Sequence, residues 1–375
     1  MARSLDSESR KSLAMSTSSQ YSSSSGGRGG PRVVVVLDFG TTFSGFAYAH
    51  TAETNTIYKF YDWPCVGKVG AKPYCKTQTS LYYETIIAEH ATQDVGHSRI
   101  APAAFKLKSW GWSALVDYTE SDWSASTPSD GGRNNSNRSC PPTIASRMKC
   151  LSVMDSEGWR PWEANMPNLS APNSLCGFFA TKFKLYLADQ HLGDRDHIPA
   201  GLSVETLIAD YLRCISRFIL SELQLRYGKH LGMDDVQWCL TVPAIWDEKA
   251  KQAMKACAEK AGMVKGPGCD YSAPASPFPL DILLEPEAAA VYCQEKVKRR
   301  INLRKGDKLL IADVGGGTID LVLHKKADND PKSLKVHEVV GSYGEVGGGT
   351  FVDSHFISFL SQKIGCFNEF CNSHP

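Results

Sequence analysis

The chain has no long apolar run, and this absence argues against a membrane-spanning helix. Its most apolar stretch, residues 33–37, is only as long as a strand. It also has little excess charge of either sign. A formal net charge of +1 does not indicate binding to nucleic acid or to an anionic membrane surface. We therefore expect neither a nucleic acid nor a membrane as a partner.

Cysteine motifs and a targeting signal are missing as well. The 12 cysteines include no CxxC pair and have no accompanying histidine cluster, so a zinc site is not expected. Residues 1–31 are rich in Ser, Gly and Arg without a hydrophobic centre, which excludes a secretory signal and predicts a disordered tail. Without a secretory signal, we expect the cysteines to be free thiols and the protein to lie in the cytoplasm, or in the nucleus.

The chain does contain the alternating pattern of an α/β protein. Its 375 residues, 42% hydrophobic and 22% charged, suffice for two soluble domains. Residues 118–175 mix Ser, Asn, Pro, Gly and Trp without helical or strand period, which predicts an irregular insertion outside the core. The predicted strands are 33–37 (buried on both faces), 43–50, 236–242, 282–284, 308–312 and 319–324, and the predicted helices are 178–187, 204–227, 247–261 and 285–300.

Two segments share one design, in which an apolar strand, an acid, a Gly/Thr-rich turn and a second strand follow in order. Residues 38–42 read Asp-Phe-Gly-Thr-Thr, and residues 313–318 read Asp-Val-Gly-Gly-Gly-Thr. Glycine lets backbone N–H groups approach an anion closely, and a nearby acid can hold magnesium through water. One such turn more often only closes a hairpin. Two such turns, each between apolar strands, predict a site that binds a nucleotide's phosphates from both sides.

This pairing resembles the actin, hexokinase and heat-shock ATPase superfamily. Leu-Thr-Val-Pro-Ala at 240–244, Glu-Pro-Glu-Ala-Ala-Ala at 285–290 and the glycine-rich 341–351 resemble the 70-kilodalton heat-shock (DnaK-type) family. Residues 76–80 and 179–184 are similar to its divergent twelfth-member branch. The resemblance implies an α/β, actin-like (ribonuclease H-like) ATPase fold with two lobes.

The resemblance also implies a domain plan. The first lobe is expected at 32–245, interrupted by the insertion at 118–175, and a crossing helix with the second lobe is expected at 246–375. The family's adenine-gripping elements would follow the point where the chain stops at Pro375. We therefore expect a second lobe that is incomplete and a product that is truncated.

Site residues are implied by position in these motifs. Lys182, Glu285 and Asp313 match catalytic positions, although Lys184 is near enough in sequence to compete with Lys182 for its match. Asp38, Asp313 and Asp320 match acids around the magnesium ion; Asp320 is equally compatible with an ordinary strand-end position. The matched nucleotide-binding residues are Gly40, Thr41, Thr42, Gly315, Gly316, Gly317, Thr318, Gly347 and Gly348.

Pro243 matches a proline proposed as a switch between the lobes, but a simple strand terminator explains it equally well. The implied function is chaperone-type ATP hydrolysis, impaired here by truncation, with ATP or ADP and Mg²⁺ as cofactors and with co-chaperones or client proteins as further partners. A non-enzymatic, nucleotide-poor remnant that acts by binding proteins is the alternative. A sugar or acetate kinase has less support, because no substrate-hydroxyl base is recognisable.

Overall fold

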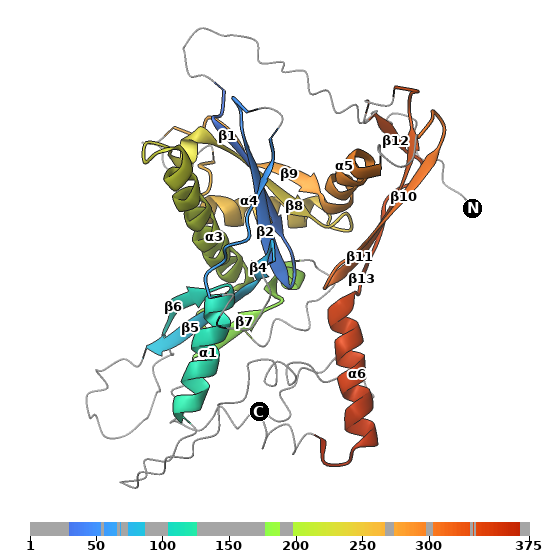
Figure 1. The fold of residues 1–375 in the computed structure, drawn as a ribbon. Coiled ribbons are helices and arrows are strands. Elements are labelled where there is room, and N and C mark those ends of the chain that lie inside the picture. Colours follow the sequence, from blue (N-terminus) through green and yellow to red (C-terminus); the bar gives the residue numbers. More distant parts are fainter. Residues whose placement is uncertain are drawn as a thin grey trace, which may run out of the picture.

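The computed structural model describes residues 30–53, 56–65, 68, 74–86, 104–125, 177–187, 198–266, 274–297, 303–330, 333 and 335–367. Over these residues the chain forms three sheets with helices packed against them, as Figure 1 shows. The predicted α/β class is confirmed. No helix in the described ranges has the length and apolar character needed to cross a membrane.

The first sheet contains the first Gly/Thr turn and has the order β3-β2-β1-β8-β9, with β4 paired to β2. β2 runs antiparallel to β1, whereas β8 and β9 run parallel to it. This arrangement agrees with the ribonuclease H-like fold expected from the sequence. The strands are β1 (Val33–Phe39), β2 (Phe43–His50), β3 (Tyr58–Lys59), β4 (Thr77–Gln78), β8 (Val236–Val242) and β9 (Asp281–Leu284).

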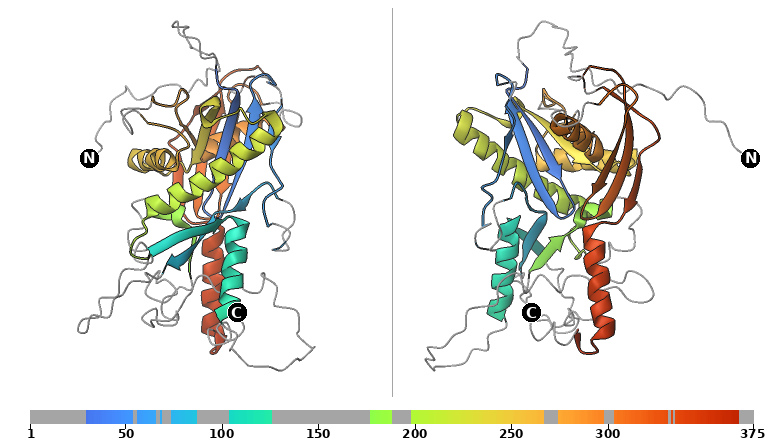
Figure 2. Two further views of the ribbon diagram at one scale, coloured as in Figure 1. Left: turned by 90° about the vertical axis from the view of Figure 1, so that its left-hand side faces the viewer. Right: turned by 45° about the vertical axis from the view of Figure 1, so that its right-hand side comes forward.

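The main core lies between this sheet and α3 (Val204–Tyr227), which crosses one of its faces (Figure 2). α4 (Glu248–Ala261) packs against α3, begins at the side-chain cap of Asp247 and ends at Gly262 in the left-handed conformation. Positions along β1 alternate between buried and half-buried. The expected burial of β1 on both faces is therefore wrong, because only the face under α3 is fully covered.

The boundary between the two lobes lies later than the sequence suggested. β9 pairs in parallel with β8, and α4 provides the crossover between them. The segment up to Leu284 therefore completes the first sheet, and the expected boundary at residue 245 is wrong. The sequence indicated β9 as a strand but not its partner, and pairing with β8 assigns it to the first sheet.

A third sheet has the order β6-β5-β7 and is covered by α1. The expected helix at 178–187 is wrong: its first half is a strand that pairs with β5, and its second half is a 3-10 helix. Backbone pairing with β5 overrides the apolar spacing that suggested a helix. The elements are β5 (Ser80–Ile86), β6 (Ala104–Trp110), α1 (Trp112–Ala125), β7 (Phe178–Thr181) and η3 (Phe183–Leu187).

The first eight residues of the expected insertion, 118–125, are helical. Residues 118–125 belong to α1, where the Tyr118 ring stacks on Phe179 of β7 with centroids 4.7 Å apart. Packing on the third sheet therefore holds this stretch in a helix that its composition did not reveal. Residues 126–175 lie outside the described residues, as does the tail up to residue 29, so both expectations remain predictions.

The second sheet contains the second Gly/Thr turn, between β10 and β11. α5 contacts this sheet and also β9 of the first, and so lies between the two sheets (Figure 1). α5 is described as far as Val297, three residues short of the expected end. The elements are α5 (Glu285–Val297), β10 (Lys308–Val314), β11 (Thr318–Lys326), β12 (Val336–Glu338), β13 (Tyr343–Val346) and α6 (Gly349–Lys363).

Candidate functional site

The two Gly/Thr turns meet face to face. A Cβ placed on Gly316 would lie 2.6 Å from Thr42 Oγ1, and one placed on Gly317 would lie 2.7 Å from Thr41 Oγ1. Real Cβ atoms do not come this close to other atoms, so glycine is required for the second turn to approach the first. The two turns therefore face each other, as expected from the sequence; that a ligand binds there remains a prediction.

Several backbone donors at this junction are available for a ligand. In the described part of the chain, the N–H groups of Thr41, Thr42, Gly316 and Gly317 donate to no protein acceptor. Neighbouring N–H groups without partners, on turns with little side-chain bulk, form a concave surface that suits an anion. The junction therefore offers a set of amide donors from two lobes.

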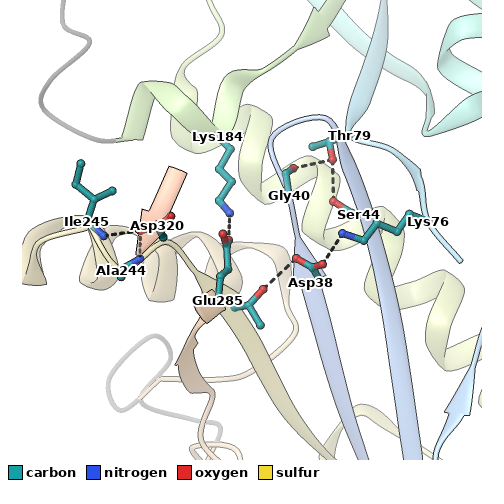
Figure 3. A network of polar contacts seen from close by, with 11 residues as sticks. Asp38, Gly40, Ser44, Lys76, Thr79, Lys184, Ala244, Ile245, Glu285 and Asp320 are labelled. Carbon is teal, nitrogen blue, oxygen red and sulfur yellow. Dashed lines mark hydrogen bonds and ion pairs between the residues drawn. The ribbon is translucent and has the colours of Figure 1, made fainter. Parts of the chain in front are cut away.

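The first turn is held in shape by Thr79, which follows β4. Thr79 Oγ1 donates a hydrogen bond of 2.8 Å to the Gly40 carbonyl, and its backbone N–H donates one of 2.8 Å to the Thr42 carbonyl. Its hydroxyl also lies 2.8 Å from that of Ser44 (Figure 3). Thr79 thus bonds the carbonyls of Gly40 and Thr42, whereas the N–H groups of the turn remain available at the junction.

The second turn is supported from behind by residues 347–350. Gly348 has φ +112°, and a Cβ there would lie 2.3 Å from the Gly315 carbonyl oxygen, so only glycine fits. The sequence match made Gly347 and Gly348 nucleotide-binding residues; the structure places both against the second turn. The supporting bonds run from the N–H of Gly347 to the carbonyl of Gly317, from Gly349 to Gly315 and from Thr350 to Gly316, each 3.0 Å long.

Asp38, at the end of β1, is paired with a lysine. Lys76 Nζ lies 2.6 Å from Asp38 Oδ2, and Thr241 Oγ1 donates a hydrogen bond of 3.2 Å to Asp38 Oδ1 (Figure 3). Burial works to lower the pKa of Lys76, but the charge and hydrogen bond of Asp38 outweigh it, so the net shift of this pKa is upward. Both oxygens of Asp38 are thus engaged by the protein.

Glu285, at the start of α5, is paired with Lys184 rather than Lys182. Lys184 Nζ lies 2.5 Å from Glu285 Oε1, and the lysine side chain is only 2% exposed (Figure 3). The ammonium also lies 5.6 Å from the ring centre of Phe39 and 5.5 Å from that of Trp246. Burial raises the pKa of Glu285, and the charge of Lys184 offsets part of that shift.

Lys182 sits in a different environment. Its φ of +57° places it in the left-handed region, which non-glycine residues rarely adopt. Burial lowers the pKa of Lys182, and the charge of Asp353 on α6 works against that shift. The two lysines, only two residues apart in sequence, therefore have different acidic neighbours.

Asp313 belongs to the same electrostatic neighbourhood as the two ion pairs. Burial raises its pKa first, and the charge of Asp38 raises it further, while Lys76 and Lys184 lower it. The pKa of Glu285 is also raised by Asp38 and Asp313. Three acids and two lysines thus gather beside the facing turns.

Asp320 binds backbone, and the charge of Asp313 in the cluster also helps to raise its pKa. Its Oδ1 accepts hydrogen bonds from the N–H groups of Ala244, at 3.0 Å, and Ile245, at 3.2 Å, just beyond the buried Pro243 (Figure 3). Its Oδ2 is buried without a hydrogen-bond partner among the described residues. Burial raises the pKa of Asp320, and the two backbone bonds oppose that shift. Asp320 therefore joins the second sheet to the turn after β8.

Comparisons with known proteins agree with the motifs. No family model matches the chain. Mouse heat shock 70 kDa protein 12A is 25% identical over 386 residues, which covers 89% of this chain and 46% of that protein. Human heat shock 70 kDa protein 12B is 23% identical over 389 residues, covering 89% of this chain and 45% of that protein. The resemblance to the heat-shock 70 kDa protein 12 branch is confirmed.

The chain spans about half the length of these heat-shock 70 kDa protein 12 relatives. Among solved structures, MreB5 of Spiroplasma citri bound to ADP matches 89% of this chain and 58% of its own, with 13% identity and a TM-score of 0.39. A structural similarity this low supports no detailed comparison of the two proteins.

Two of the three acids that the sequence analysis places around magnesium and its waters are already engaged by the protein. In the described ranges, no three His, Cys, Asp or Glu side chains come together as metal ligands. Asp38 is engaged by Lys76 and Thr241, and Asp320 by the turn after β8. Asp313 is the one expected metal acid in the cluster for which the described residues provide no hydrogen bond or ion pair.

Several site residues escaped the sequence analysis. Lys76 and Thr79 stand in a segment that was noticed only for its resemblance, and Thr241 in one noticed for its proline. Lys184 was considered only as a rival to Lys182. The available signal was the Lys-Thr-Gln-Thr order at 76–79, which places a cation and hydroxyls immediately before a strand.

Proposed function

We propose that this chain binds the phosphates of ATP or ADP between its two Gly/Thr turns, as a unit similar to heat-shock 70 kDa ATPases. One observation carries the proposal: two glycine-dependent turns from different sheets face each other with unpaired backbone N–H groups. Similarity to the heat-shock 70 kDa protein 12 relatives over 89% of the chain supports it.

The chemistry of the junction suits a polyphosphate. Amide donors at Thr41, Thr42, Gly316 and Gly317 would hold phosphate oxygens without any need to rearrange, because each turn is already fixed from behind. The ammonium groups of Lys76 and Lys184 stand nearby to balance negative charge. Neither feature alone identifies a nucleotide, but together they match the charge and shape of a phosphate chain.

Chaperone-type ATP hydrolysis is the finer form of the proposal. Phosphoryl transfer to water depends mostly on positioning and charge stabilisation, which fixed amides and a held carboxylate provide. Within this proposal, Glu285, held by Lys184, is the carboxylate that would orient a water molecule. We accordingly assign to Lys184 the lysine role that sequence matching gave to Lys182. We assign no step to magnesium.

Ligand-dependent thermal stability tests the proposal on the purified chain. The melting temperature is measured against increasing ATP, ADP and AMP, since a ligand that binds only the folded state raises it. We expect saturable stabilisation by ATP and ADP and much less by AMP, which has fewer phosphates. Gly316→Val should abolish the effect, because its side chain would collide with Thr42.

Gly341→Ala is the matched control, because a Cβ at this position meets nothing within 4 Å. The control should respond to ATP as the parent chain does. Equal stabilisation of the Gly316→Val variant would contradict the proposal. Phosphate release in the parent chain and in Glu285→Gln then tests hydrolysis separately, with a loss expected in the variant.

A second candidate, function through protein contacts alone, is favoured by one feature of α6. Val352, Phe356 and Phe359 are 67%, 58% and 50% exposed and recur at helical spacing, so they form an apolar stripe open to solvent. A chain that acts only in this way would show no change in melting temperature with any of the nucleotides. The nucleotide titration therefore separates the two candidates.

A further inference from the structure

The acids beside the two turns already have cations of their own. Lys76 Nζ lies 2.6 Å from Asp38 Oδ2, and Lys184 Nζ lies 2.5 Å from Glu285 Oε1. With Asp313, the cluster holds three carboxylates and two ammonium groups, a formal sum of one negative charge. The two lysines bring the same two positive charges that one Mg²⁺ ion would bring.

One of these carboxylates, that of Asp38, already has two protein partners. Magnesium needs a near-octahedral shell of oxygen ligands, commonly one or two carboxylates together with waters and phosphates. Each oxygen of Asp38 already has one partner: Lys76 contacts Oδ2 and Thr241 contacts Oδ1. Recruiting Asp38 to a metal would require breaking the ion pair with Lys76.

The lysines differ in how firmly they are fixed. The Lys184 side chain is 2% exposed and lies near two aromatic rings, so its position in the site is fixed. The Lys76 side chain is 30% exposed, so a ligand can reach it from solvent. Lys76 can therefore contact an incoming phosphate while remaining near Asp38.

We propose that Lys76 and Lys184 replace the divalent cation in this cleft, so that the chain binds free ATP with little dependence on magnesium. The inference rests on the proposed nucleotide function and goes beyond it. Lys76 is the residue that sets this cofactor requirement. Removing its charge would both weaken the site for free ATP and release Asp38 for a metal.

The experiment compares ATP binding with and without the metal. Apparent dissociation constants are obtained from melting temperatures over an ATP series, once with excess EDTA and once with excess MgCl₂, with MgCl₂ alone as a blank. For the parent chain we expect the two constants to agree within about threefold. For Lys76→Met we expect binding in EDTA to weaken by about tenfold or more and to recover substantially with MgCl₂.

Two further variants control for charge and for folding. Lys76→Arg keeps the positive charge and should behave as the parent chain does. Lys108→Met removes a lysine from another lysine–carboxylate pair, with Glu84 at 3.0 Å on the third sheet, and should leave both constants unchanged. The melting temperature of each variant without ligand shows whether it is folded.

The outcomes are distinct. If the parent chain binds ATP about tenfold or more tightly with MgCl₂ than with EDTA, the inference fails and the proposed nucleotide function stands. The inference also fails if Lys76→Met shows the parent's affinity in EDTA. If ATP has no effect in either buffer, the proposed function fails and the inference fails with it.

Discussion

The carboxylate of Asp320 accepts a hydrogen bond from the backbone N–H of Ala244, 3.0 Å away. Asp320 stands on β11 of the second sheet, and Ala244 follows β8 of the first. The bond thus connects the two sheets at the turn that contains the candidate switch Pro243. It also gives a reason, separate from metal binding, for an acid at position 320.

Replacing Asp320 with Ala should lower the free energy of unfolding by about 1–3 kcal/mol, because two N–H groups lose their acceptor in a buried setting. Asp320→Asn keeps the accepting oxygen and should cost clearly less. Urea denaturation of both variants provides the measurement, with Arg217→Ala on an exposed position of α3 as a control. Equal losses for the Ala and Asn variants would show that the negative charge, and not the hydrogen bonds, matters.

The two neighbouring lysines should differ in their effect on stability. Lys184→Met leaves Glu285 without its partner in a largely buried position, so we expect a loss of about 3–5 kcal/mol in the free energy of unfolding. Lys182→Met should cost about 1 kcal/mol or less, because no close ion pair is lost. Comparable losses in chemical denaturation would contradict the assignment of Lys184 to the cleft. The double variant Lys184→Met with Glu285→Gln should recover part of the loss.

Gly348→Ala should disrupt the second turn. The new Cβ would lie 2.3 Å from the Gly315 carbonyl oxygen, at a φ of +112° that alanine rarely adopts. We expect a loss of stability of about 1–3 kcal/mol, together with loss of ATP-dependent stabilisation. Gly349→Ala is the matched control, since its Cβ meets nothing within 4 Å. A Gly348→Ala variant that binds ATP normally would mean that the segment 347–350 does not support the turn.

His324 on β11 should make stability depend on pH. Burial lowers the pKa of His324, which is 7% exposed, and the charge of Glu338 on the paired strand β12 opposes that shift. Because the folded state disfavours protonation, the contribution of His324 is complete above the unfolded value of about 6.5 and is lost as pH falls below it.

His324→Gln should therefore flatten the fall in unfolding free energy between about pH 6.5 and 5.5. Denaturation series at several pH values give the slopes for the parent chain and the variant. His337→Gln, at an exposed position on β12, should keep the parent's slope. An unchanged slope for His324→Gln would sink the prediction. Carboxyl groups with raised pKa values act in the opposite direction, but they are common to all three proteins.

Much of the local structure was predictable from sequence because local signals agreed. The helix at 204–227 has an apolar face of regular spacing, and α4 has an aspartate cap and a terminal glycine. The two Gly/Thr turns were recognisable because each lies between apolar strands. Where a segment's structure depends on a distant partner, prediction failed. Residues 178–181 form a strand because β5 is there to pair with, and residues 118–125 extend α1 because Tyr118 can stack on Phe179.

The sequence by itself determined that two phosphate-type turns exist, that the chain alternates strands and helices, and which acids stand beside the turns. Glycine content and strand flanks suffice for this, since they act within a few residues. Only the tertiary structure decided that Lys184 pairs with Glu285, and that Lys76 pairs with Asp38. Partners separated in sequence are determined by how the sheets and helices pack. Lys182 precedes the 3-10 helix and Lys184 lies on it, so the two lysines have different acidic neighbours.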